Sequence, residues 1–508
     1  MKNKISKQKI FEILAIILIA IYSITLTPRT LQNDTFYAIK IGELITQTEN
    51  VDMLEHFSWH SGLEYTYPHW LYDTLTYLIY NNMGQMTGIY VVTCILAAIL
   101  GIAIYRINRK IAKNQFLSFI IAMVSMYMLK DFITARAQLV TFILFALELF
   151  FIEKLVDTNN KKYGIPIIII SILIANLHVA VWSFFFILGL PYIAEYIVRI
   201  IEEKMSKKYG KEIREDYKII IPRREGAKTL ILIMIICIFT GLLTPLGSTP
   251  YTYLLKTMAG TTTQSINEHQ PLVLFSNINV LVILIVTLTV LTFTKVKIKL
   301  SDLFMLAGLI ALTFYSKRQS TMLIIIGLPI VNKLVYEWFS NGDEQTDKKL
   351  IDMFVNKIGV PLITIVALLL SLYTMKPKIE TPYVDEKSYP VEMSNFIIEY
   401  FNNDFTNVRL YNQYNYGSYL LYRGIPVFID SRADLYDPIF NKGVNVFTDF
   451  IECDNLEVYF EDTFKKYDIT HVILYKDSKI NMIIKNAELK NYKLLKQDDY
   501  FVFYEIEK

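Results

Sequence analysis

Long apolar runs, separated by short polar stretches, fill most of the first 375 residues. A helix of about 20 apolar residues spans a bilayer, and a helix is the one lone segment that satisfies its own backbone hydrogen bonds in lipid. The composition agrees, with 53% hydrophobic residues and a mean hydropathy of +0.34. The sequence therefore predicts a polytopic α-helical membrane protein with about eleven transmembrane helices. They are expected near residues 10–27, 86–105, 116–131, 138–154, 164–177, 179–198, 229–246, 274–294, 302–315, 320–337 and 358–375.

The polar stretches between these runs differ in charge. Every second stretch is rich in lysine and arginine, with 28 such residues in 1–9, 106–115, 153–163, 199–228, 295–299 and 333–357, against 7 in the others before the tail. Positive charge marks the cytoplasmic side. We therefore expect a multi-pass cell-membrane protein with a cytoplasmic N-terminus and an extracytoplasmic C-terminal domain. The first run could instead be a signal peptide, but no small-x-small cleavage site follows it.

Two outer segments are longer than a simple connection requires. Residues 28–85 contain two stretches with helical periodicity, Phe36–Gln47 and His69–Tyr80, whose tyrosines and tryptophan suit a membrane surface. Residues 69–82 could form either a surface helix or an extra span. The other long segment is 247–273. We assign residues 1–375, including both segments, to a transmembrane domain.

The remaining tail, 376–508, is expected to fold as an extracytoplasmic α/β domain. Its short β-rich runs alternate with helical ones, which is typical of such a domain. The predicted strands are Val408–Asn412, Pro426–Ile429, His471–Tyr475, Tyr492–Lys496 and Phe501–Tyr504. The predicted helices are Val391–Phe401, Gly417–Tyr422, Leu456–Lys466 and Ile480–Ala487.

Several function classes find no support in the sequence. The net charge of +3 gives no reason to expect a nucleic-acid partner. The three cysteines show neither a disulfide framework nor zinc-ligand spacing. Nucleotide-binding glycine loops and the signatures of serine hydrolases and zinc proteases are missing from the sequence. No cofactor is therefore indicated, although a divalent metal is left open.

Asp34 is the first candidate for chemistry, because it follows the first span closely on the outer side. Burial beside a bilayer can raise the pKa of a carboxyl group toward neutrality, where it works as a general base. Glu43 follows on the same predicted helix, near Ile39 and Lys40, and is the second catalytic candidate. The alternative is that Asp34 only caps a helix beginning at Thr35.

Other outer residues could bind substrate. His69 and Asp73 are spaced i, i+4 on one helix face and could hold a metal, position a phosphate, or merely pair with each other. Arg136 and Arg318 lie in tight turns between spans, where guanidinium groups suit phosphate, although snorkelling toward the interface is the alternative. His178 lies within a long apolar run, between two short helices that we expect to meet at Asn176–His178, and an intramembrane histidine is a functional candidate.

The tail contributes a further set. Asp430, Arg432 and Asp434 directly follow the predicted strand Pro426–Ile429, and ligands gather beyond the carboxyl ends of strands in open α/β sheets. We predict a substrate-facing loop here. Internal salt bridges that fix the loop are the alternative.

Together, these features resemble the C-type membrane glycosyltransferases. The residues that carry the resemblance are NDTFYAIKIGE around Asp34, the stretch from FSW to YPHWLYD ending at Asp73, INEHQP around Glu268 and His269, and FIDSRADLY in the tail. Within these enzymes the chain is most similar to the protein O-mannosyltransferase and aminoarabinose transferase branch and its bacterial relatives of unassigned substrate. One departure is that the mannosyltransferases follow the acid directly with Glu, whereas Thr35 follows Asp34.

The resemblance implies transfer of a sugar from a polyprenyl-phosphate donor to the hydroxyl of an extracytoplasmic glycan, lipid or protein. Asp34 would be the general base, while Arg136 and Arg318 would bind the donor phosphate. Its intramembrane position, and not the resemblance, makes His178 a further candidate for the phosphate. Substrate-positioning roles would fall to His69, Asp73, Glu268, His269, Asp430, Arg432 and Asp434. Two rival hypotheses are a flippase for a lipid-linked sugar, which would need polar residues at the bilayer midplane, and a glycan-binding membrane scaffold.

Overall fold

The structure is a computed structural model that describes residues 6–209, 218–341, 343 and 345–507. The chain forms two compact units. The helical bundle comprises the chain up to Pro28, Val91–Thr244 and Asn267–Glu380, and the mixed unit comprises Arg29–Tyr90, Pro245–Ile266 and the chain from Thr381. The sequence-based division at residue 375 places the long outer segments with the spans, whereas this grouping places most of both segments with the tail.

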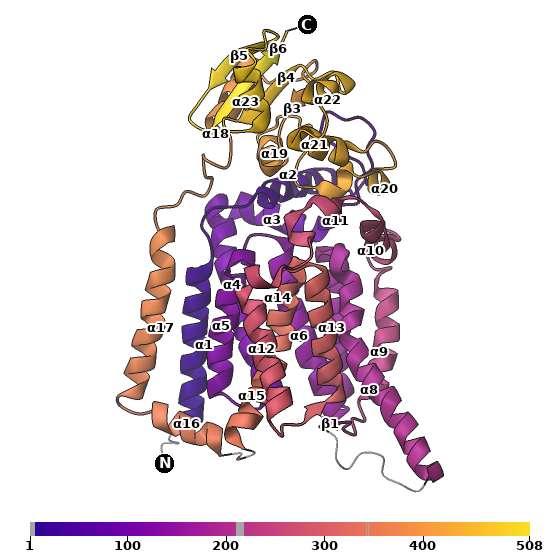
Figure 1. Ribbon diagram of the computed structural model, residues 1–508, viewed down its shortest axis with the longest axis vertical. Helices are drawn as coiled ribbons and strands as arrows, with labels where there is room; N and C mark the ends of the chain where they lie inside the picture. The colour runs from indigo at the N-terminus through magenta and orange to yellow at the C-terminus, as the bar shows by residue number, and fades with distance from the viewer. Residues whose placement is uncertain (1–5, 210–217, 342, 344, 508) are drawn as a thin grey trace. The chain divides into compact units, whose positions relative to one another are not determined.

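The helical bundle is built from the predicted apolar runs, each of which contains a helix (Figure 1). Five of the described helices are long and apolar enough to cross a membrane: Lys7–Leu26, Met86–Ala112, Val179–Lys207, Lys317–Ser340 and Gly359–Lys378. The bundle helices are α1 Lys7–Leu26, α4 Met86–Ala112, α5 Phe116–Met128, α6 Ala137–Thr158, α7 Gly164–Leu177, α8 Trp182–Tyr209, α9 Ala227–Thr240, α12 Ile278–Phe293, α13 Leu300–Tyr315, α14 Ser320–Met322, α15 Leu328–Ser340, α16 Thr346–Phe354 and α17 Gly359–Met375.

Small residues let these helices approach closely. A Cβ added to Gly101 of α4 would lie 2.4 Å from the Ser23 hydroxyl oxygen of α1, so only glycine fits at this contact. Van der Waals contact of this kind holds helices together in lipid, where the hydrophobic effect between them is weak. The buried Ser23 hydroxyl donates to the Ile19 carbonyl of its own helix at 2.7 Å, so that it remains satisfied.

Two bundle helices are interrupted. The predicted break at His178 is confirmed, because α7 ends at Leu177 and a short 3-10 turn, Val179–Val181, precedes α8. The second interruption lies in the helix that follows Arg318. There, a π turn at Leu323–Gly327 separates α14 from α15. A π turn widens the helix by one residue per turn and is frequent at functional sites.

The mixed unit contains a four-stranded sheet with the strand order β3-β4-β6-β5. Strand β3 pairs parallel with β4, and the other two pairings are antiparallel. Four of the five predicted strands are therefore present, as β3 Leu410–Tyr411, β4 His471–Tyr475, β5 Tyr492–Gln497 and β6 Phe501–Ile506. The strand expected at Pro426–Ile429 is wrong. Its Val427 makes only an isolated bridge to Ser58, because its extended backbone meets the first outer segment instead of the sheet.

Helices surround this sheet and continue into the long outer segments. They are α2 Asn33–Thr48, α3 Trp70–Asn82, α10 Thr249–Ala259, α11 Thr262–Ser265, α18 Val391–Tyr400, α19 Tyr414–Tyr422, α20 Pro438–Asn441, α21 Val446–Asn455, α22 Phe460–Lys466 and α23 Lys479–Asn486. All four helices predicted in the tail are present, with shifted ends. At 13 residues, α3 is shorter than a bilayer requires.

Aromatic rings and one glycine join α2 to its neighbours. The Phe36 ring of α2 lies 4.9 Å from the Tyr389 ring and 5.1 Å from the Tyr419 ring of α19, both edge-on. On another side of α2, a Cβ added to Gly42 would lie 2.0 Å from the Asp73 carbonyl oxygen of α3. Glycine at this position lets α2 and α3 touch along their backbones.

Candidate functional site

In the bundle, the loop before α12 meets the turn before α14. The backbone N–H of Lys317 donates to the Gln270 carbonyl at 2.9 Å, and the Ser316 hydroxyl donates to the Glu268 carbonyl at 3.3 Å. These bonds hold the 3-10 turns Asn267–His269 and Lys317–Gln319 together. The sequence-predicted residues Glu268, His269 and Arg318 are therefore brought into one neighbourhood.

Arg136 completes this neighbourhood, which we call the arginine cluster: Arg136, Glu268, His269 and Arg318. A guanidinium nitrogen of Arg136 lies 3.6 Å from the Glu268 carboxylate. Burial lowers the pKa of His269 to about 4, and the positive charges of Arg318 and Arg136 act in the same direction against the opposing Glu268. At neutral pH the cluster therefore contains an uncharged imidazole beside two guanidinium groups.

Both arginines lie at the beginnings of helices. Arg136 is the N-cap residue of α6, and Arg318 lies in the turn that leads into α14. The N-terminus of a helix carries a partial positive charge and free N–H groups, so it attracts anions. The Arg136 side chain is 23% exposed and that of Glu268 is 43% exposed. The cluster is therefore an accessible, positively charged site that suits a phosphate group.

His178, the residue that ends α7, lies beside α6, the helix that Arg136 caps. It is buried, and its Nδ1 lies 3.2 Å from the Thr141 hydroxyl of α6. Thr141 comes five residues after Arg136, which places it about 8 Å further along the helix axis. His178 thus contacts the helix that begins after Arg136, and its assignment to the donor phosphate remains a prediction.

In the mixed unit, Asp34 lies in the first turn of α2 and not at its cap. The helix begins at Asn33 and its N-cap residue is Gln32, so the capping alternative does not apply. A carboxylate in the first turn still benefits from the helix dipole. Glu43 lies further along α2, where the Lys40 ammonium group is 2.5 Å from its carboxylate. Its predicted catalytic role would require it to leave that ion pair.

Asp73 and His69 lie at the beginning of α3, beside α2. His69 is the N-cap residue, and its Nδ1 lies 3.5 Å from the Tyr37 hydroxyl of α2. The Asp73 carboxyl group is buried, and its Oδ2 has no hydrogen-bond partner within the described residues. Burial raises the pKa of Asp73 well above 3.8, Asp34 adds repulsion, and Arg432 opposes both effects. Burial thus favours the protonated form of Asp73, in the neighbourhood of Asp34.

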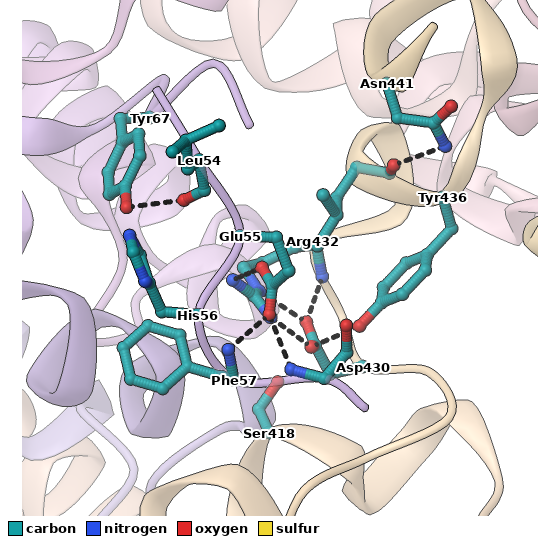
Figure 2. A network of polar contacts seen from close by, with 12 residues as sticks. Leu54, Glu55, His56, Phe57, Tyr67, Ser418, Asp430, Arg432, Tyr436 and Asn441 are labelled. Atoms are coloured by element: carbon teal, nitrogen blue, oxygen red, sulfur yellow. Dashed lines mark hydrogen bonds and ion pairs between the residues drawn. The ribbon is translucent and has the colours of Figure 1, made fainter. Parts of the chain in front are cut away.

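Asp430 and Arg432 form a buried network with Glu55, which we call the Arg432 network (Figure 2). The guanidinium group of Arg432 donates to Glu55 at 2.6 Å and to Asp430 at 2.7 Å. The Tyr436 hydroxyl donates to Asp430 at 2.6 Å. The side chains of Arg432, Glu55 and Asp430 are 1% exposed or less.

The Arg432 network consists of internal salt bridges, which the sequence left open as the alternative to a substrate-facing loop. Glu55 also accepts backbone N–H bonds from Phe57 and Ser58, each at 2.6 Å. Sequence reasoning missed Glu55, because its partner lies 377 residues away and no local pattern marks it. The substrate-positioning role of Asp430 and Arg432 therefore remains a prediction, and any such role would be indirect.

Asp434 and Asp437 bind the 245–266 segment to the tail. Asp434 accepts hydrogen bonds from the Tyr253 and Thr262 hydroxyls, and Asp437 accepts from the backbone N–H of Thr261 at 2.7 Å. These bonds explain why this segment folds with the tail. The predicted substrate contact of Asp434 remains a prediction.

No three histidine, cysteine, aspartate or glutamate side chains within the described residues form a group that could hold a metal ion.

The architecture resembles solved membrane transferases. One is the archaeal oligosaccharyltransferase AglB from Archaeoglobus fulgidus, in complex with an inhibitory peptide and a dolichol-phosphate, with a TM-score of 0.57 and 10% identity over 94% of this chain and 70% of that chain. Another structure of the Archaeoglobus fulgidus oligosaccharyltransferase, tethered to an acceptor peptide, gives a TM-score of 0.55 and 10% identity over 98% of this chain and 74% of that chain. The chain has the fold of the C-type membrane glycosyltransferases.

This fold agrees with the superfamily that the sequence resembles, but it does not distinguish the mannosyltransferase and aminoarabinose transferase branch. No family model and no curated protein matches the chain. The fold and the five long apolar helices of the described residues agree with the expected multi-pass membrane protein, and neither names its substrate.

Proposed function

We propose that this protein transfers a sugar from a polyprenyl-phosphate donor to the hydroxyl group of an extracytoplasmic acceptor. The observation that carries the proposal is the arginine cluster, where two guanidinium groups at helix N-termini lie beside an uncharged imidazole. The fold supports it, because the similar AglB structure was solved with a dolichol-phosphate and another with an acceptor peptide.

Arg136 and Arg318 hold the donor phosphate and stabilise its growing negative charge as the bond to the sugar breaks. An uncharged His269 adds a hydrogen bond without releasing a proton. His178 supports the phosphate from behind. Because the donor is already activated, ATP is not required.

Asp34 takes the proton from the acceptor hydroxyl as its oxygen attacks the anomeric carbon. The bond between the anomeric carbon and the phosphate oxygen breaks, and polyprenyl phosphate leaves with the bonding electrons. A single displacement of this kind inverts the anomeric configuration. Asp73, whose protonated form is favoured by burial, can donate a hydrogen bond to the sugar, while His69 and Glu43 position the substrate around Asp34.

The proposed topology has eleven spans, a cytoplasmic N-terminus and an extracytoplasmic tail. The acceptor is a glycan, lipid or protein, held by the tail and the 247–273 segment, and Glu268, Asp430, Arg432 and Asp434 are assigned substrate-positioning roles. Hexosyl and pentosyl donors both fit this chemistry.

The test uses purified full-length protein with candidate polyprenyl-phosphate sugars and measures release of polyprenyl phosphate. Asp34→Asn keeps the shape of the side chain and removes the base, so transfer is expected to fall about 10²- to 10⁴-fold. Glu64→Gln, at an exposed ion pair with Lys442, is the matched control and should leave the rate unchanged. Transfer by Asp34→Asn at the wild-type rate would show that Asp34 is not the base.

A further inference from the structure

Helix α10, Thr249–Ala259, carries exposed apolar side chains along one face. Leu255 is 68% exposed and Met258 is 64% exposed, and Tyr251 lies on the same face. Residues spaced i, i+4 and i+7 share one side of a helix. A contiguous apolar stripe on an otherwise anchored helix marks an interaction surface.

The opposite side of α10 is anchored to the tail. The buried Tyr253 donates its hydroxyl hydrogen bond to Asp434, and its ring lies 5.2 Å from the Phe440 ring. The Lys256 ammonium group lies 5.6 Å from the Phe440 ring centre. Beyond the helix, the Thr261 hydroxyl donates to Asp437 at 3.0 Å. These contacts fix the orientation of α10, so its apolar face is a constant feature of the mixed unit.

The chain on both sides of this segment continues into exposed apolar surface. Leu242 and Leu243 follow α9 and are well exposed, and Phe275 and Ile278 lead into α12 in the same way. An apolar helix of a membrane bundle exposes such residues to lipid. A fully extended chain reaches about 3.5 Å per residue, so residues 244–248 between Leu243 and α10 span about 20 Å at most. The covalent connection alone keeps α10 close to the end of a lipid-facing helix.

We propose that α10 lies in the interface of the outer leaflet and seats the mixed unit on the membrane. Its partner is the lipid bilayer itself, at the boundary between headgroups and acyl chains. Leu255 and Met258 insert into this boundary, where amphipathic helices bind through their buried apolar area. Lys256 stays on the anchored side of the helix, over the Phe440 ring. Because Asp434 and Asp437 bind the same segment, this lipid contact is linked to the tail within the mixed unit.

The test measures lipid contact directly. Full-length protein carries an environment-sensitive fluorophore on Leu255→Cys or on Met258→Cys, in one-protein nanodiscs of phosphatidylcholine and phosphatidylglycerol. Thr252→Cys, on the flank of the same helix, is the matched control. The native Cys94, Cys237 and Cys453 are all buried, so background labelling is low.

Labels at 255 and 258 should be quenched by doxyl groups on lipids and be several-fold less sensitive to aqueous iodide than the label at 252. Equal iodide quenching at all three positions would overturn the proposal. Shielding that appears only after polyprenyl phosphate is added would also overturn it, because the occupant would then be the donor's prenyl chain. Because each nanodisc holds one protein, a second copy of the protein cannot be what shields the labels from iodide.

A second measurement does not depend on an attached fluorophore. The double variant Leu255→Asp/Met258→Asp should release α10 from the lipid and increase trypsin cleavage after Lys256 several-fold in nanodiscs. Tyr253 and its aspartate partner are unchanged in this variant. Cleavage at the wild-type rate would contradict the membrane contact, whether or not the protein proves to be a transferase.

Discussion

The arginine cluster and the Arg432 network use the same chemical groups in opposite ways. In the Arg432 network the ion pairs are 2.6 Å and 2.7 Å long and the side chains are 1% exposed or less. In the arginine cluster the ion pair between Arg136 and Glu268 is 3.6 Å long, and both side chains are partly exposed. Short, buried ion pairs stabilise the fold, whereas a residue in an accessible ion pair can exchange its protein partner for a ligand. The comparison therefore predicts that the Arg432 network governs stability and that the arginine cluster governs activity.

The largest effect is expected from Arg432→Ala. Removing one partner of a buried ion pair leaves uncompensated charge on Glu55 and Asp430, which typically costs about 3–5 kcal/mol. The mixed unit should lose that much free energy of unfolding, measured by denaturant titration or by its protease resistance. Lys442→Ala, which removes the exposed pair with Glu64, should change stability by less than about 1 kcal/mol and serves as the control. Equal effects of the two variants would show that the Arg432 network does not hold the fold.

Arg318→Gln and Arg136→Gln should show the reverse pattern. Loss of a charge-assisted hydrogen bond to phosphate costs about 1.5–3 kcal/mol, so transfer should fall about 10- to 150-fold. Stability should change little, because these side chains lie at accessible turns. The measurement is the rate of polyprenyl phosphate release at low donor concentration, with the melting temperature recorded in parallel. A variant that melts early but transfers normally would reverse the assignment of the cluster.

The smallest effect per unit of pH concerns Asp73, a buried acid that, unlike Asp430, has no guanidinium bonded to it within the described residues. Its pKa is raised in the folded protein, so above pH 3.8 the folded state binds a proton that the unfolded state has lost. Asp73 therefore stabilises the fold fully below pH 3.8, and this contribution is lost as the pH rises. Over that rise the free energy of unfolding should fall by up to about 1.4 kcal/mol per pH unit.

Asp73→Asn keeps the side chain neutral at every pH and should flatten this dependence. Denaturant titrations of both proteins between pH 5 and 8 provide the measurement. Parallel curves for the two proteins would mean that Asp73 is already ionised in the fold.

The sequence predicted the helices far better than the sites. Apolar runs and turn residues are local signals, so each expected span contains a helix and the break at His178 was found. The strand expected at Pro426–Ile429 had the right local propensity, but its backbone partner is Ser58, far away in the chain. Pairing across hundreds of residues leaves no trace in a local pattern.

The candidate site was predicted in part for the same reason. Arg136, Glu268, His269 and Arg318 stood out because charges beside apolar runs are costly, and the structure gathers them. Asp430 and Arg432 stood out equally, yet the deciding partner, Glu55, lies in a segment with no distinctive pattern. Residue type and position along the chain identify polar sites, but burial separates a ligand site from an internal ion pair.

The π turn at Leu323–Gly327 sets the direction in which Arg318 points. One extra residue in that turn rotates everything before it by about 100° relative to α15, because successive residues of a helix are turned by that angle. The inner part of this helix is fixed by packing around the buried Asn332, which donates to Asn108 at 3.0 Å. The number of residues in the π turn thus determines the angular position of the Arg318 guanidinium around the helix axis. Deleting one residue from the turn would rotate Arg318 away from its present position, although no polar side chain would be changed.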